Sequence, residues 1–126
     1  MVNYWAVLVA ALVSMILGMI WYNPKVFGKH WTKLSGVKPK KEMDKKMMLI
    51  AFIGNIVMAG ILSMFVIAGD LMIGLKVGFY LWLGFIGTTT LGSVLWQGKP
   101  WGLWFLNNAY NLLNILVMAV IFVYWA

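Results

Sequence analysis

The fold is decided at Trp21-Tyr22-Asn23-Pro24-Lys25-Val26-Phe27-Gly28-Lys29-His30-Trp31, where the first long apolar run of the chain ends and a lysine-rich stretch begins. Tryptophan and tyrosine are enriched at membrane–water interfaces, and lysines gather in the loops on the cytoplasmic side. This segment therefore predicts the point at which the chain leaves a bilayer and turns along its surface.

A short amphipathic helix is predicted to follow, over about residues 24–35. Asn23 is a favoured N-cap, and Pro24 suits the first helical position, where its missing N–H costs nothing. Apolar residues and lysines then recur at helical spacing on two different faces, and Gly36 is placed to end the helix. Such a helix lies in the membrane interface with its lysines toward lipid phosphates. A plain basic loop is the alternative.

Composition indicates an integral membrane protein. The chain has 126 residues, of which 63% are hydrophobic and 10% charged, whereas a soluble domain carries about 25% charged residues. The net charge of +7 comes from lysines that adjoin apolar runs, so membrane topology explains it better than nucleic-acid binding. With no cysteine and one histidine, the chain offers no metal cluster, and no cofactor is expected.

We predict an all-α fold, an integral membrane four-helix bundle that forms a single domain over residues 1–126. The runs at residues 3–22, 47–68, 75–95 and 101–124 are long enough to cross about 30 Å of hydrocarbon. The first run lacks a basic leader and a clear cleavage site, so we interpret it as a retained span rather than a signal peptide.

Small residues recur at every fourth position in three of these spans, which lets helices approach closely. The stripes are Ala6, Ala10, Ser14 and Gly18; Ala51, Asn55, Ala59 and Ser63; and Gly84, Thr88 and Gly92. We expect these faces to pack against other helices. Because four helices bury only part of them, we also predict a homo-oligomer, most simply a two-fold dimer.

The most polar face lies on the fourth span, where Asn107, Asn111 and Asn114 recur at helical spacing beside Asn108. Asparagine is unfavourable in hydrocarbon, so these side chains must face protein or water. Together with Asn55 and Thr88 they form a candidate polar cavity or helix-packing face. Interhelical hydrogen bonds in membranes average only about 0.6 kcal/mol, and both interpretations stay open.

No catalytic arrangement is evident, so no enzyme is expected. The three acidic residues lie in loops or at span ends, and the glycines lack the strand–loop–helix context of phosphate-binding loops. We favour a structural or interaction bundle that self-associates or serves as a small subunit of a larger membrane complex. The alternative is a small transporter or channel for a neutral solute, with a polar path along the fourth span.

Three segments resemble an uncharacterised family of small bacterial and archaeal four-helix membrane proteins, labelled only as a domain of unknown function. They are residues 21–31, the run Leu83–Thr90, and the turn 96–101 continued by residues 103–110. The resemblance covers nearly the whole chain and implies a four-span fold with its motifs at one membrane face, but no activity or substrate. The candidate residues of this face are Trp21, Tyr22, Asn23, Pro24, Phe27, Gly28, Trp31, Trp96, Gly98, Pro100 and Trp101.

The distribution of lysines predicts the orientation in the cell (plasma or inner) membrane. Lysines 25, 29, 33, 38, 40, 41, 45 and 46 lie between the first two spans and Lys99 between the last two, whereas Lys76 alone falls on the other side. Lysine-rich loops stay in the cytoplasm. We therefore expect the basic segment of residues 23–46 to be cytoplasmic, to contact anionic lipids, and to leave both termini outside.

Overall fold

The computed structural model describes residues 3–37, 45–66 and 69–125, and within these ranges the chain is helical without any strand. Four helices are long and apolar enough to cross a membrane, namely α1 (Tyr4–Trp21), α3 (Lys45–Ser63), a helix from Leu71 to Leu95, and α7 (Trp101–Tyr124). A shorter helix, α2 (Gly28–Ser35), follows α1. The predicted all-α fold with four helices of membrane-crossing length is confirmed.

The third apolar helix is longer than predicted. It comprises α4 (Leu71–Leu81), the π-helical segment η1 (Trp82–Gly87), α5 (Thr88–Thr90) and α6 (Gly92–Leu95). It begins at Leu71 rather than at residue 75, because the side chain of Asp70 accepts a hydrogen bond from the Ile73 N–H at 3.1 Å and caps the first turn. The second span, predicted to reach residue 68, is helical only to Ser63, and residues 67–68 lie outside the described ranges.

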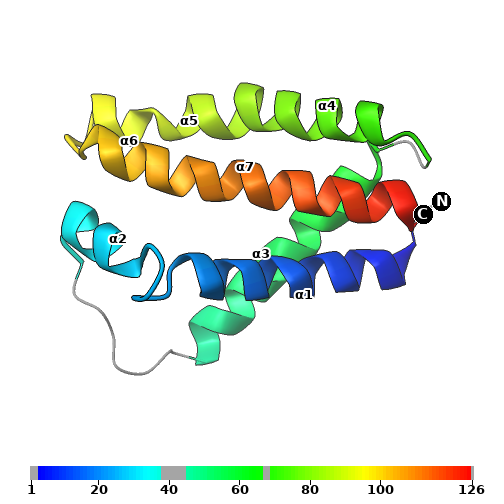
Figure 1. Ribbon diagram of the computed structural model, residues 1–126, viewed down its shortest axis with the longest axis horizontal. Helices are drawn as coiled ribbons and strands as arrows, with labels where there is room; N and C mark the ends of the chain where they lie inside the picture. The colour runs from blue at the N-terminus through cyan, green and yellow to red at the C-terminus, as the bar shows by residue number, and fades with distance from the viewer. Residues whose placement is uncertain (1–2, 38–44, 67–68, 126) are drawn as a thin grey trace.

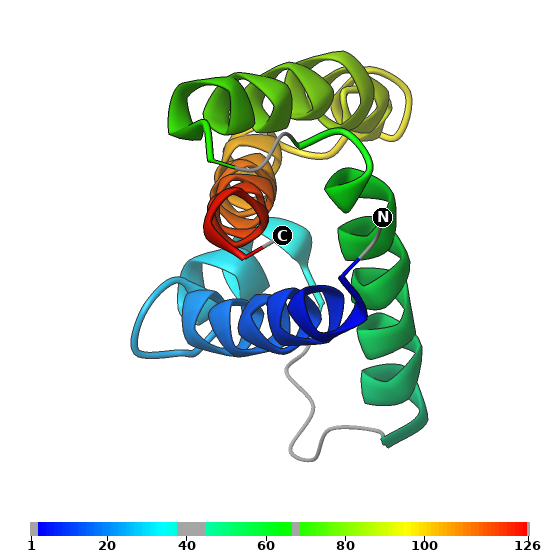
Figure 2. The ribbon, with the colours of Figure 1, turned by 90° about the vertical axis from the view of Figure 1, so that its right-hand side faces the viewer.

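Three of the long helices run alongside one another, with α7 between α1 and the α4–α6 helix, while α3 crosses them obliquely (Figures 1 and 2). Both ends of the chain lie at one end of the molecule. The helix α2 and the turn between α6 and α7 lie at the other end. Sequence segments that are far apart therefore meet at the end opposite the termini.

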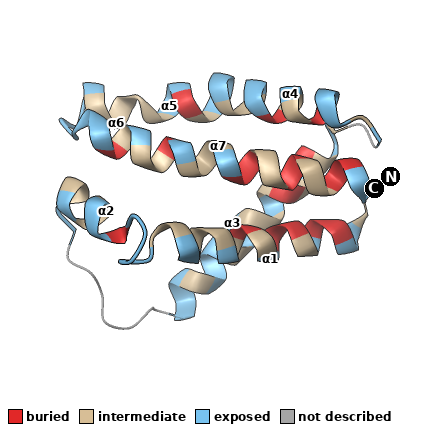
Figure 3. Ribbon diagram, viewed as in Figure 1, coloured by how far each residue is buried: buried red, intermediate tan, exposed pale blue. Residues whose placement is uncertain are grey.

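The core lies toward the end that carries the termini, where buried residues concentrate (Figure 3). Ala6 and Ala10 of α1, Ala59 of α3 and Ala119 of α7 are completely buried, together with the larger Met118. Alanines allow the three helix backbones to approach closely, and Met118 fills the space between them. The small-residue stripe of the first span therefore packs as predicted.

The stripes of the second and third spans behave differently. Ala51, Gly84 and Thr88 are exposed, so these positions of the stripes do not pack against other helices of the same chain, and their packing against a helix of a second molecule stays a prediction. Gly74 and Gly78 pack against α7 instead, and a Cβ built on Gly74 would lie 2.4 Å from Val123 Cγ2. The π-helical segment holds more residues per turn than an α-helix, which rotates the positions after it relative to those before it.

The amphipathic helix begins later than predicted, because residues 24–27 form a turn and α2 starts at Gly28. The Asn23 side chain accepts a hydrogen bond from the Lys25 N–H at 2.9 Å, and its carbonyl accepts the N–H groups of Val26 and Gly28. Asn23 thus closes a local turn instead of capping a helix, and Pro24 is not the first helical residue. The predicted stop is correct, since Gly36 adopts the left-handed conformation with φ 73°.

Candidate functional site

The end of the molecule opposite the termini is built from the segments singled out by the sequence. The α2 helix packs on the start of α7, where a Cβ on Gly102 would lie 3.3 Å from Leu34 Cδ2. Five aromatic rings join α1, the turn, α2 and α7, with centroids 4.5 Å apart for Trp21–Phe27, 6.0 Å for Tyr22–Trp31 and 5.4 Å for Tyr22–Tyr110. Residues 21–31 are thereby held against α7.

Tyr22 connects this aromatic cluster to the asparagine face of α7. Its hydroxyl donates a hydrogen bond to Asn107 Oδ1 at 2.8 Å. Burial, reinforced by neighbouring Tyr110, raises the pKa of Tyr22 to about 12, so the phenol keeps its proton at neutral pH and remains a donor. The bond turns the Asn107 oxygen toward Tyr22 and leaves the amide NH2 group available elsewhere.

Two asparagines of the predicted polar face belong to a closed cluster in the middle of the bundle. Ser14 Oγ lies 2.5 Å from Asn114 Oδ1 and 3.2 Å from Asn55 Oδ1. One hydroxyl proton serves a single acceptor, so the other amide is expected to turn its NH2 group toward Ser14 Oγ. Ser14 and Asn114 are both buried. The cluster links α1, α3 and α7 through side-chain hydrogen bonds.

Replacing Asn114 by leucine is expected to lower the free energy of unfolding by about 1–2 kcal/mol, because the change removes a buried partner of Ser14. Unfolding in mixed detergent micelles, followed by circular dichroism, would measure the loss. Asn111→Leu is the matched control, since Asn111 lies on the same helix and its side chain forms no hydrogen bond with the described part of the chain. Equal losses in the two variants would contradict this role of the cluster.

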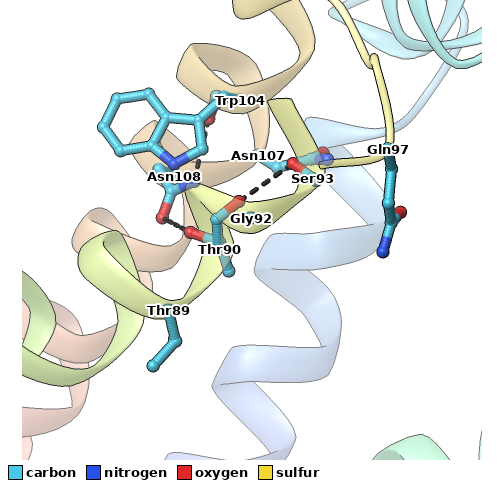
Figure 4. A pocket seen from close by; sticks show the side chains of 8 residues that line it. All are labelled: Thr89, Thr90, Gly92, Ser93, Gln97, Trp104, Asn107 and Asn108. Atoms are coloured by element: carbon cyan, nitrogen blue, oxygen red, sulfur yellow. Dashed lines mark hydrogen bonds between the residues drawn. The ribbon is translucent and has the colours of Figure 1, made fainter. Parts of the chain in front are cut away.

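A cavity of about 330 Å³ opens between α5, α6, the following turn and the start of α7 (Figure 4). We call it the α6–α7 pocket. Its lining residues all carry neutral side chains, and they are Thr89, Thr90, Gly92, Ser93, Gln97, Trp104, Asn107 and Asn108.

Hydrogen bonds fix the walls of the α6–α7 pocket. Asn108 accepts a bond from Thr90 Oγ1 at 3.1 Å and donates one to the Trp104 carbonyl at 3.0 Å (Figure 4). The turn that carries Gln97 is tied to α6 by the Lys99 N–H, which donates to the Ser93 carbonyl at 3.0 Å. The pocket is therefore a built feature of α6, the turn and α7.

The predicted polar face is thus divided among separate environments. Asn107 and Asn108 line the α6–α7 pocket, whereas Asn55 and Asn114 belong to the Ser14 cluster. Asn111 is half-buried between them along α7. Thr88 lies apart from both sites, with an exposed side chain whose hydroxyl donates to the Gly84 carbonyl at 2.7 Å. The face is a bonded cluster in its middle and an open pocket at one end.

Several residues of these two sites were not predicted from the sequence, namely Ser14, Thr89, Thr90, Gly92, Ser93, Gln97 and Trp104. The spacing marks Ser14 only as one of the small residues of its stripe. The signal for Thr90 and Ser93 was their spacing of three on one helix, which places both hydroxyls on one face. Gln97 carried no such signal, because its position depends on how the turn folds back on α6.

Among the described residues, no three histidine, cysteine, aspartate or glutamate side chains lie close enough together to hold a metal ion. Among the residues predicted to lie at one membrane face, Trp96 is 86% exposed and Trp101 is also exposed. Gly98 supplies the left-handed backbone of the turn with φ 70°, and Pro100 precedes the first residue of α7. These residues shape the turn and are not among those that line the α6–α7 pocket.

Comparison with known proteins identifies a family to which the chain is similar. The family described as "Protein of unknown function (DUF1761)" matches residues 5–123. No curated protein and no solved structure matches the chain. The match spans all four apolar helices and the segments that build both sites.

Proposed function

We propose a function for this chain as a member of the DUF1761 family, to which it belongs through the match over residues 5–123. It works as a self-associating interaction bundle in the cell (plasma or inner) membrane. Four apolar helices of membrane-crossing length support residence in a membrane. Their exposed surfaces are rich in large apolar side chains, which suits contact with lipid or with another membrane helix.

Self-association is supported above all by the Gly84–Thr88 face, the exposed side of η1 and α5 formed by these two residues. A Cβ on Gly84 would meet no atom within 4 Å, and the Thr88 hydroxyl is already bonded to the Gly84 carbonyl. Two small residues four positions apart let a second helix approach closely in a membrane. A second copy fits best, because a two-fold contact would set the same small face of each copy against the other.

Cysteine cross-linking in membranes tests this contact. The native chain has no cysteine, so Gly84→Cys introduces a single thiol. Mild oxidation is expected to convert most of this variant into a disulfide-linked dimer, because thiols on a two-fold axis lie within bonding reach. Gly54→Cys is the matched control, since Gly54 of α3 is also exposed and has the large side chains of Ile50 and Ile53 beside it.

A dimer band for Gly84→Cys and not for Gly54→Cys supports self-association through this face. Native mass spectrometry should then show that Gly84→Leu shifts the dimer to monomer. Monomer at every concentration in the wild-type protein would overturn the proposal. A mass that contains a different protein would indicate instead a small subunit of a larger membrane complex.

The second candidate function, handling of a neutral solute, is favoured by the α6–α7 pocket. Asn107 and Asn108 of the predicted path line it. The predicted polar path along α7 is interrupted beyond the pocket, because Ser14 and Asn114 are buried and hydrogen-bonded to each other farther along the bundle. This candidate therefore becomes binding at one end of the molecule rather than conduction through it.

A further inference from the structure

The hydroxyl groups of the α6–α7 pocket present acceptors to its interior. Thr89 Oγ1 donates to the Phe85 carbonyl, and Ser93 Oγ donates to the Thr90 carbonyl at 2.9 Å. Thr90 Oγ1 has the Ile86 carbonyl and Asn108 Oδ1 as acceptors, so its proton also stays within the protein. With their protons engaged, these oxygens offer only lone pairs to a bound molecule.

Donors in the pocket come from side-chain amide groups. Asn107 gives its oxygen to Tyr22 and so has its NH2 group free, while the exposed Gln97 offers both a donor and an acceptor. The pocket thus combines several acceptors with a few neutral donors within a small volume.

Charge limits which molecules this pocket can hold. No charged side chain lines it, so neither an anion nor a cation would find a compensating partner there. The same end of the molecule carries Lys29 and Lys33 on α2 and Lys99 in the turn, which disfavours cations further. A fitting ligand is therefore neutral, with several hydroxyl donors and some acceptors.

We infer that the α6–α7 pocket binds a neutral polyhydroxyl group, the chemistry of a polyol or a sugar. Its volume of about 330 Å³ lies at the lower end of the range of about 300–1,000 Å³ for small-molecule sites, which suits a group of monosaccharide size. Hydroxyl groups donate to Thr89, Thr90 and Ser93 and accept from the amides. Tyr22 is a positioning residue that orients Asn107.

Two sources can supply this chemistry, a free polyol in the aqueous phase or the sugar headgroup of a lipid at the interface. This inference gives the second candidate function its ligand class and does not depend on self-association. The Gly84–Thr88 face shares no residue with the pocket, so each proposal can fail while the other stands.

The test uses the full chain in nanodiscs of phosphatidylcholine and phosphatidylglycerol. Purification must avoid maltoside and glucoside detergents, because their headgroups carry the same chemistry and would compete. Saturation-transfer NMR with glycerol, myo-inositol and glucose forms the free-ligand arm. Retention of added glucosyl-diacylglycerol in native mass spectrometry forms the lipid arm, and choline and inorganic phosphate serve as charged comparators.

Three variants make the test specific to the pocket. Asn107→Leu removes the free amide donor and should weaken binding by about tenfold or more, the effect of one lost hydrogen bond. Gln97→Leu should also weaken binding, and its exposed position in a turn leaves the bundle intact. Asn111→Leu is the control on the same helix and should bind as the wild-type protein does.

Binding of the free polyols that the two pocket variants weaken supports an aqueous ligand. Binding of the glycolipid alone, weakened in the same way, supports a lipid headgroup. The inference is overturned if neither arm binds, if Gln97→Leu and a folded Asn107→Leu bind like the wild-type protein, or if phosphate or choline binds in place of the polyols.

Discussion

Replacing Gly28 by alanine is expected to lower the stability of this protein sharply, although it adds only one methyl group. A Cβ at this position would lie 2.3 Å from the Tyr22 carbonyl oxygen and 2.8 Å from the Asn23 carbonyl carbon. Both are backbone atoms, which no change of rotamer can move away. Overpacking costs about 1–3 kcal/mol where side chains can adjust, so we expect a loss at or above the top of that range.

The damage should spread from the turn to the pocket. The Gly28 N–H donates to the Asn23 carbonyl, so the turn cannot widen without losing this bond. Tyr22 begins the same turn and orients Asn107 through its hydroxyl. Gly28→Ala should therefore lower the midpoint of thermal unfolding in detergent and also weaken ligand binding in the pocket, if the pocket binds as proposed.

Alanine substitutions at two other glycines provide a scale for the loss of stability expected of Gly28→Ala. Gly54→Ala is the control, because a Cβ there would meet no atom within 4 Å and alanine favours the helix. Gly74→Ala should fall between the two, since its Cβ would meet Val123 Cγ2, a side-chain methyl that can shift. Circular dichroism during heating would rank the three variants. A Gly28→Ala protein as stable as Gly54→Ala would show that the turn relaxes freely.

Patterns within a single helix were predictable from the sequence. The stripe of Ala6, Ala10 and Ser14 marked a packing face, because the spacing alone places these residues together. Gly36 marked the end of α2, because the left-handed backbone conformation that ends a helix is favoured by glycine, which has no side chain. These features depend on local geometry, and the fold preserves them.

Features that depend on tertiary rotation were not predictable. The π-helical segment Trp82–Gly87 shifts the helical register of Thr88 and the residues after it, and nothing in the residue spacing signals such a segment. Likewise, helical spacing places Asn107 and Asn114 on one face of α7. In the structure, Ser14 of α1 packs against Asn114 and buries it, whereas the turn that carries Gln97 leaves a pocket beside Asn107. The division of the asparagine face thus arises from neighbours that sequence spacing does not encode.

A membrane-impermeant maleimide applied to whole cells is expected to label a cysteine placed after Ala126 and to spare one that replaces Lys33. The structure places the described ends of the chain at one end of the molecule and α2 with the α6–α7 turn at the other (Figure 1). The two test positions therefore lie on opposite sides of the membrane if the long helices cross it. Orientation then depends on which end carries the lysines.

The lysines are distributed very unevenly between the two ends. Lys25, Lys29 and Lys33 lie on the turn and α2, and Lys99 lies on the α6–α7 turn. Lys45 and Lys46 begin α3, and Lys76 lies in the first half of α4. Lysines 38, 40 and 41 belong to the same connection in sequence but lie outside the described residues. Each lysine near an anionic leaflet contributes about 1 kcal/mol, so the lysine-rich end should stay cytoplasmic.

Aromatic residues at both ends are consistent with two interfacial belts. Trp21, Tyr22, Trp31, Trp96 and Trp101 lie at the lysine-rich end, whereas Tyr4, Trp5, Tyr124 and Trp125 lie at the other. Permeabilised cells provide the control, because there the cysteine at position 33 should become labelled as well. Equal labelling of both positions in intact cells would mean mixed insertion, which so strong a lysine bias disfavours, and would refute the predicted orientation. Labelling of position 33 alone would invert it and place the α6–α7 pocket outside the cytoplasm.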